Sequence, residues 1–175
     1  RGILVLTMLY DSGAVVKSEV EDEPDIEIEN RYDQNNRLVY SGPFRNKIPV
    51  GVHREFGADG KVTNSKVYND NGLLLSEGIV DEGGRYNGRW KDFYPDGKTA
   101  AEGQYTDSRR SGVWRFYNNS GKLEQTGSYN NGRPDGLWTW YYEIGEVLRE
   151  EEYWHVEHAS SQGIKRIQRC ARYLQ

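Results

Sequence analysis

The sequence contains few of the residues that link or anchor a small domain. Among 175 residues there is one cysteine, Cys170, which excludes an internal disulfide framework but does not decide the compartment. Apolar runs are short as well. Ile3 to Leu9 (ILVLTML) is far below the roughly 18 residues of a membrane-spanning helix and predicts a strand, with a remnant of a signal-peptide core as the alternative.

A large excess of one charge is also missing. The formal net charge is −4 and the pI is about 5.5, so the chain as a whole has no electrostatic attraction to nucleic acid or to acidic lipid. Nucleic acid is therefore not expected among its partners.

Aromatic residues and glycine are abundant instead. Only 35% of the residues are hydrophobic, which gives little material for a deep core, yet the chain has 13 Tyr, 5 Trp and 20 Gly. Many short strands, joined by tight turns and covered by large side chains, fit this composition. It predicts an all-β protein.

A 24-residue repeat runs through the second half of the sequence. Trp90, Trp114 and Trp138 are each 24 residues apart. Four more columns keep this spacing: Gly97, Gly121 and Gly145; Tyr105, Tyr129 and Tyr153; Gly103 and Gly127; Gly88, Gly112 and Gly136. Such periodicity is typical of proteins built from stacked structural repeats.

The register continues toward the N-terminus in a weaker form. His53 occupies the tryptophan column there. Gly72 follows Gly60 by only 12 residues, which indicates a half unit inserted near residues 61–72. Residues 10–13 (YDSG) are the candidate turn of a still earlier, eroded unit. Other positions that fit the register are Gly42, Phe44, Gly51 and Phe56.

Each unit is predicted to form one β-hairpin. Around Trp114, residues 114–117 are the first strand, 118–121 (NNSG) the turn, 122–129 the second strand and 130–136 the return loop. Successive hairpins give an elongated, single-layer antiparallel sheet of stacked repeats.

The chain is interpreted as one structural domain with three parts. Residues 1–31 are an eroded repeat or edge strands with an acidic segment, residues 32–154 are the repeat array, and residues 155–175 are a C-terminal cap.

Alternation along the strands divides the aromatic residues between two faces. One face is expected to carry a ladder of six rings: Trp90, Tyr105, Trp114, Tyr129, Trp138 and Tyr153. We interpret this ladder as structural, because a single-layer sheet must cover itself with its own side chains. The alternative is a row of stacking platforms for sugars, bases or a proline-rich peptide. Phe93, Tyr117 and Tyr141 fall on the opposite face and are the candidate partner-contact residues.

The stretch from Gly112 to Trp138 (GVWRFYNNSGKLEQTGSYNNGRPDGLW) resembles the bacterial variant of the MORN repeat. The shared pattern is Gly-x-Trp-x-x-Tyr, a turn glycine, then Glu-Gly-x-Tyr and Asn-Gly. The resemblance is strong over residues 78–154 and fair over 32–60. It implies a sheet of hairpins used as a scaffold for protein contacts, sometimes linked to membranes. Glu151 departs from the glycine column, so the array is expected to end there.

The segments beyond the array carry weaker patterns. Glu19 to Glu29 has seven carboxylates but no calcium-loop spacing, and it predicts an exposed edge strand or loop, with an electrostatic contact to a basic partner as the alternative. Residues 163–175 predict a short amphipathic helix that caps the sheet; a membrane surface or an acidic segment of another chain are the alternatives. His155, His158 and Cys170 lack a fourth zinc ligand, so no metal is expected.

These patterns favour a non-enzymatic scaffold for protein–protein interaction through one face of the sheet. No nucleotide-binding loop, catalytic triad or zinc-protease motif is present in the sequence, and no cofactor is expected. The alternative is a carbohydrate-binding or cell-envelope-binding surface protein that uses exposed aromatic side chains. The protein partner is unidentified. Peripheral membrane contact is an open alternative without specific support, and open sheet edges allow a homodimer. The cell surface or periplasm is favoured over the cytoplasm.

Overall fold

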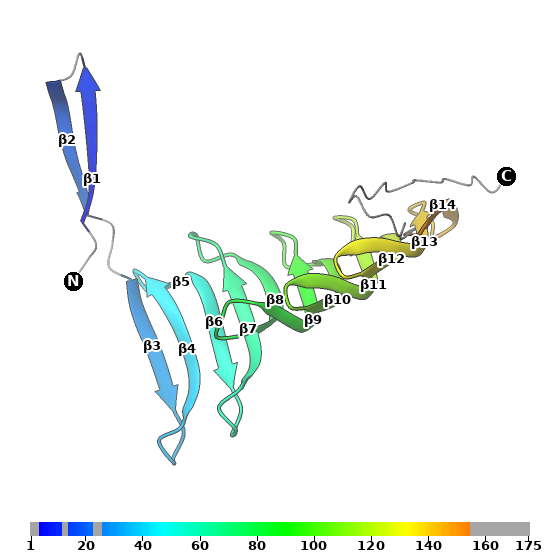
Figure 1. Ribbon diagram of the computed structural model, residues 1–175, viewed down its shortest axis with the longest axis horizontal. Coiled ribbons are helices and arrows are strands. Elements are labelled where there is room, and N and C mark those ends of the chain that lie inside the picture. The colour runs from blue at the N-terminus through cyan, green and yellow to red at the C-terminus, as the bar shows by residue number, and fades with distance from the viewer. Residues whose placement is uncertain (1–3, 12–13, 23–25, 155–175) are drawn as a thin grey trace, which may run out of the picture.

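The computed structural model describes residues 4–11, 14–22 and 26–154 (Figure 1), and in these ranges the chain forms β-strands and turns without a helix. β1 (Leu4–Asp11) and β2 (Ala14–Asp22) pair with each other in a two-stranded sheet of their own. The other strands form one sheet of twelve. These strands are β3 (Ile26–Tyr32), β4 (Leu38–Arg45), β5 (Ile48–Pro49), β6 (Gly51–Phe56), β7 (Val62–Tyr68), β8 (Leu74–Val80), β9 (Tyr86–Phe93), β10 (Thr99–Thr106), β11 (Arg109–Tyr117), β12 (Leu123–Asn130), β13 (Arg133–Tyr141) and β14 (Val147–Tyr153).

The strands of the large sheet follow one another in chain order. The order is β14 to β6, then β4 and β3, all antiparallel, and the short β5 pairs with β4. Figure 1 shows the sheet twisting strongly from β3 toward β14, and none of the described strands packs on it as a second layer. The predicted fold class, an elongated all-β sheet of stacked hairpins, is confirmed.

One type of wide turn recurs along the sheet. In the turn at residues 118–122, Asn118 N donates to Lys122 O (2.9 Å) and Gly121 N donates to Asn118 O (2.8 Å). The Asn118 Oδ1 also accepts bonds from Ser120 N and Lys122 N. Gly121 has a φ of 84°, which a residue with a Cβ adopts only with strain. The same backbone bonds close turns that begin at Asp33, Gly57, Asn69, Asp81, Tyr94 and Tyr142.

The prediction of a return loop over residues 130–136 is wrong. Two residues make the connection, Asn131 (φ 51°) and Gly132 (φ 80°), and β13 starts directly at Arg133. Positive φ at both positions is the pattern of a tight hairpin turn whose twist matches the strands. Gly136 has a φ of 68° and lies where the pairing of β12 with β13 shifts register. Most of the residues predicted as loop therefore remain paired in the sheet.

The inserted half unit is the single strand β7 with its turn. Wide turns begin 12 residues apart at Gly57 and Asn69, so they alternate between the two ends of the strands here. Because neighbouring strands run antiparallel, one extra strand reverses the direction in which the next unit starts. A reversed unit that continues along the same sheet is related to the earlier units by a half-turn about the long axis of the sheet. Such a half-turn exchanges the two faces.

The cross-strand pairs confirm this exchange. His53 pairs with Lys66, and Lys66 pairs with Glu77. Glu77 pairs in turn with Lys91, and directly paired residues share a face. Lys91 follows Trp90 in β9, so these two side chains point to opposite sides. His53 and Trp90 therefore occupy equivalent sequence columns on opposite faces.

Candidate functional site: the two faces of the repeat array

The tryptophan face carries the three repeated tryptophans, which are almost completely buried. Trp90, Trp114 and Trp138 are 3%, 0% and 4% exposed. Successive rings contact one another edge-to-face, in the order expected from the sequence. The centroid distances are 5.5 Å for Trp90–Tyr105, 5.2 Å for Tyr105–Trp114, 6.2 Å for Trp114–Tyr129, 5.0 Å for Tyr129–Trp138 and 6.0 Å for Trp138–Tyr153. This geometry is the one that aromatic pairs prefer.

Glycine and a backbone carbonyl fix each tryptophan. A Cβ on Gly103 would lie 2.3 Å from the Trp114 ring, so only glycine permits the indole to lie flat on the neighbouring strand. Trp114 Nε1 donates to Gln104 O at 3.1 Å, ten residues upstream. Trp138 repeats both features with Gly127 and Ser128 O.

Trp90 satisfies its indole N–H differently. The carbonyl ten residues upstream belongs to Val80, and it already accepts a bond from Arg54 Nε at 2.9 Å. Trp90 Nε1 donates instead to Asp92 Oδ1 at 2.8 Å. Burial raises the pKa of the Asp92 carboxyl, and the indole bond opposes that rise.

Side chains four residues upstream in the same strands close over Trp90 and Trp114. Tyr86 stacks on Trp90 with 4.4 Å between centroids. Arg110, 24 residues later, holds its guanidinium 4.4 Å from the Trp114 centroid and 5.5 Å from the Tyr129 centroid. The ring faces are therefore occupied by the protein itself.

The opposite surface, called the tyrosine face, carries Phe93, Tyr117 and Tyr141. All three are half-buried, and each directly precedes a wide turn. Tyr117 Oη donates to Glu102 Oε1 at 2.7 Å, and Tyr141 Oη lies 3.3 Å from Thr126 Oγ1. Burial raises the pKa of Tyr117, and the Glu102 carboxylate adds to the rise.

Two apolar residues on the tyrosine face were not singled out from the sequence. Val113 is 53% exposed and Leu137 54% exposed, and they alternate with the buried Trp114 and Trp138. They stand 24 residues apart, so the repeat register could have identified them as equivalent positions on this face.

A row of charged residues crosses the tyrosine face beside them. Cross-strand pairs connect it in the order Lys66, Glu77, Lys91, Glu102 and Arg115. The sign alternates at every step, which favours this pairing over a shifted register. The row gives the surface a fixed charge pattern.

The histidine cluster occupies the N-terminal end of the tyrosine face. It consists of Tyr40, Phe44, His53 and Tyr68, whose rings contact His53 with centroids 4.8–5.8 Å apart. His53 Nε2 lies 2.9 Å from Pro43 O, and since a carbonyl only accepts, this nitrogen carries the proton. The Nδ1 atom then accepts from Tyr40 Oη at 2.6 Å. Burial lowers the pKa of His53 and so favours the neutral form of the ring.

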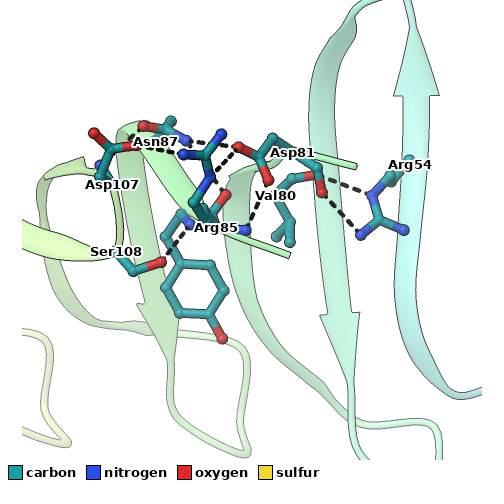
Figure 2. A network of polar contacts seen from close by, with 8 residues as sticks. Arg54, Val80, Asp81, Arg85, Asn87, Asp107 and Ser108 are labelled. Carbon is teal, nitrogen blue, oxygen red and sulfur yellow. Dashed lines mark hydrogen bonds and ion pairs between the residues drawn. The ribbon is translucent and has the colours of Figure 1, made fainter. Parts of the chain in front are cut away.

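Polar contacts run from β6 to the turn between β10 and β11 and so connect the histidine cluster region to the tryptophan region (Figure 2). Arg54 reaches over β7 to the carbonyls of Val80 and Asp81. Asp81 accepts two bonds from Arg85, whose guanidinium also pairs with Asp107 at 3.2 Å. These bonds hold together the strands on either side of β7, where the units before and after the inserted half unit meet.

The described residues contain no group of three or more His, Cys, Asp or Glu side chains placed to hold a metal ion. Nor do these residues form any helix long and apolar enough to cross a membrane. His155, His158, Cys170 and the expected C-terminal helix lie outside the described ranges.

Comparison with known families identifies the repeat. The family described as "MORN repeat variant" matches residues 86–107, 110–131 and 134–155. Residues 86–155 are MORN repeats. The matched units contain the three buried tryptophans, and MORN repeats generally form non-catalytic scaffolds that contact proteins or membranes. Residues 86–155 therefore form a repeat scaffold.

Other comparisons add little. No curated protein matches the chain. The structure entitled "Crystal structure of accessory secretory protein 1,2 and 3 in Streptococcus pneumoniae" is similar at 15% identity over 67% of this chain, with a TM-score of 0.25. The match spans 19% of that chain, and a TM-score this low supports no argument.

Proposed function

We propose that the MORN array is a non-enzymatic scaffold that binds a protein partner through the tyrosine face of β9–β14. The observation that carries the proposal is the unequal use of the two faces. The tryptophan side chains are buried by internal packing, whereas Val113 and Leu137 stay more than half exposed on the same face as Phe93, Tyr117 and Tyr141.

The composition of this surface suits a protein partner. Val113 and Leu137, exposed on alternate strands of one face, give apolar area that a partner can bury, and exposed apolar side chains of this kind are found at interaction sites. The neighbouring row from Lys66 to Arg115 adds charges of both signs, which orient a partner rather than merely attract it. Tyrosines with bonded hydroxyls are already ordered, so little side-chain entropy is lost on binding.

Carbohydrate binding has less support. A sugar ring needs an open aromatic face, and the indoles of Trp90, Trp114 and Trp138 are covered by neighbouring side chains. The rings of Phe93, Tyr117 and Tyr141 are half-buried, and the Tyr117 hydroxyl is already bound to Glu102.

Site-specific photo-crosslinking in cells of the native source tests the proposal. A benzoyl-phenylalanine is placed at Leu137 on the tyrosine face or, as the matched control, at Arg149 on the tryptophan face, which stacks on Trp140 at 4.2 Å. We expect one or a few protein adducts from the Leu137 position and at least fivefold less from Arg149.

A second variant checks that the adduct reports binding. Val113→Glu with Leu137→Glu should remove at least nine-tenths of the partner recovered by the wild-type chain while leaving the β-sheet circular dichroism spectrum unchanged. Equal adducts from both faces, or glycan-array binding without any protein adduct, would overturn the proposal.

A further inference from the structure

The edge strand β3 is exposed along its entire length. All seven residues are exposed, including Ile26 (51%), Ile28 (58%) and Tyr32 (56%). β3 pairs with β4 on one side, and no described strand pairs with its other side. Its outer backbone N–H and C=O groups therefore offer a template for another strand.

Two kinds of side chain alternate along this edge. Glu27 and Glu29 pair with Phe44 and Gly42, so they project on the tyrosine face next to the histidine cluster. Ile26 and Ile28 project on the other face. Glu29 binds Arg31 at 2.6 Å, whereas Glu27 has no ion pair in the described part of the chain.

We propose that β3 is a docking edge for an extended segment of a protein partner in which Lys or Arg alternates with apolar residues. Such a segment adds a thirteenth strand to the sheet of twelve. Its basic side chains lie beside Glu27 and Glu29, and its apolar side chains cover Ile26 and Ile28. This surface is separate from the one proposed above for β9–β14.

The charges argue against a second copy of the chain as the occupant. Two β3 edges paired antiparallel in the register centred on Ile28 bring Glu27 of one copy against Glu29 of the other. The opposite edge, β14, contains Glu150, Glu151 and Glu152, so head-to-tail pairing also brings like charges together. Like charges directly opposite each other destabilise a strand pair.

β2 pairs with β1 and not with β3. The carboxylates of Glu27 and Glu29 thus discourage an acidic strand at this edge and leave it selective for a basic one.

A peptide-binding assay with the full chain tests the proposal. The probe is a fluorescent seven-residue peptide in which lysine alternates with isoleucine or valine; the comparison peptide has glutamate in place of lysine. In fluorescence anisotropy we expect the basic peptide to bind at least tenfold more tightly, with affinity falling as salt rises, since exposed charge pairs are screened. Hydrogen exchange of the β3 amides should slow by about tenfold or more with the basic peptide bound.

Three controls assign the binding to backbone pairing at this edge. The basic peptide with N-methyl groups along its pairing edge keeps its charge but should lose binding at least tenfold. Glu27→Lys with Glu29→Lys should reverse the preference to the acidic peptide, and the milder Glu27→Gln with Glu29→Gln should reduce the preference about threefold or more. Glu150→Lys with Glu152→Lys, at the other edge, should leave the affinity within twofold.

Several results overturn the proposal. Equal binding of the two peptides would show that the edge does not select for basic side chains. Unchanged binding of the N-methylated peptide would show that the peptide does not add as a strand. An equal loss in the β14 variant places the peptide elsewhere. A wild-type dimer in sedimentation that the β3 glutamine variant strengthens identifies a second copy as the occupant.

Discussion

The hairpins of β3–β6 and those of β9–β14 use the same local structure on opposite sides of the sheet. His53 and Trp114 each lie over a glycine eleven positions upstream and each donate to the carbonyl ten positions upstream. His53 Nε2 binds Pro43 O as Trp114 Nε1 binds Gln104 O. The difference between the regions is the number of strands that separate them.

This comparison separates local from global determinants. The hairpin residues decide which side chain packs on which glycine, and they do so equally well with histidine or tryptophan. The parity of the strand count decides which face receives the packed side chain. An odd insertion such as β7 therefore gives one sheet two differently covered faces, without any change in the hairpin rules.

Removing the half unit should abolish the difference between the two regions. Deletion of residues 61–72 joins Gly60 to Leu73, so that Leu74 takes the place of Val62 opposite Phe56. Gly78 then pairs with His53, as Gly127 pairs with Trp114. We expect His53 to move to the tryptophan face, detected as NOEs between its ring and the Trp90 indole.

The wild-type chain is the control for that spectrum, since it should give NOEs from His53 to Tyr40, Phe44 and Tyr68. If the shortened chain folds and His53 keeps those contacts without gaining any to Trp90, strand parity does not determine the face.

Truncating the buried ring should cost more in the tryptophan region than in the histidine cluster. Trp114→Ala removes a fully buried indole that contacts Tyr105, Phe116 and Tyr129, and it should lower the free energy of unfolding by about 4 kcal/mol. His53→Ala removes a smaller ring and should cost about 2 kcal/mol. Urea unfolding measures both, and an equal loss would mean that the two regions are energetically equivalent despite their different rings.

The glycine under each ring should be equally indispensable in both regions. Gly127→Ala places a Cβ 2.0 Å from the Trp138 ring, and Gly42→Ala places one 2.4 Å from His53. Each should destabilise the protein by about 3 kcal/mol, because the ring must leave its position. Val113→Ala, at an exposed site in the same sheet, should stay within about 0.5 kcal/mol of wild type. A change below about 1 kcal/mol at either glycine would show that the ring relocates freely.

The sequence predicted much of this architecture and missed the exchange of faces. The 24-residue register identified the hairpins, the ring ladder and the inserted half unit, because each repeats a short-range requirement for glycine, tryptophan or tyrosine. The face of His53 depends on how many strands lie between two units, which no single repeat encodes. The return loop at residues 130–136 was wrong because Asn131 and Gly132 close the turn alone and Gly136 absorbs the register shift within the strand.

The smallest expected difference between the regions is a dependence on pH, because only the N-terminal ring titrates. Burial lowers the pKa of His53 below its usual value near 6.5, so the unfolded chain binds more protons than the folded chain as the pH falls through that value. Stability contributed by neutral His53 is thus complete above pH 7 and declines as the pH drops from about 6.5 toward the lowered pKa. Protonation would place a second donor at Nδ1, which now accepts from Tyr40 Oη. His53→Phe should remove this decline, and the difference between the two urea-unfolding profiles from pH 7.5 to 5 isolates it from the carboxylates; parallel profiles would mean that His53 does not titrate differently in the folded chain.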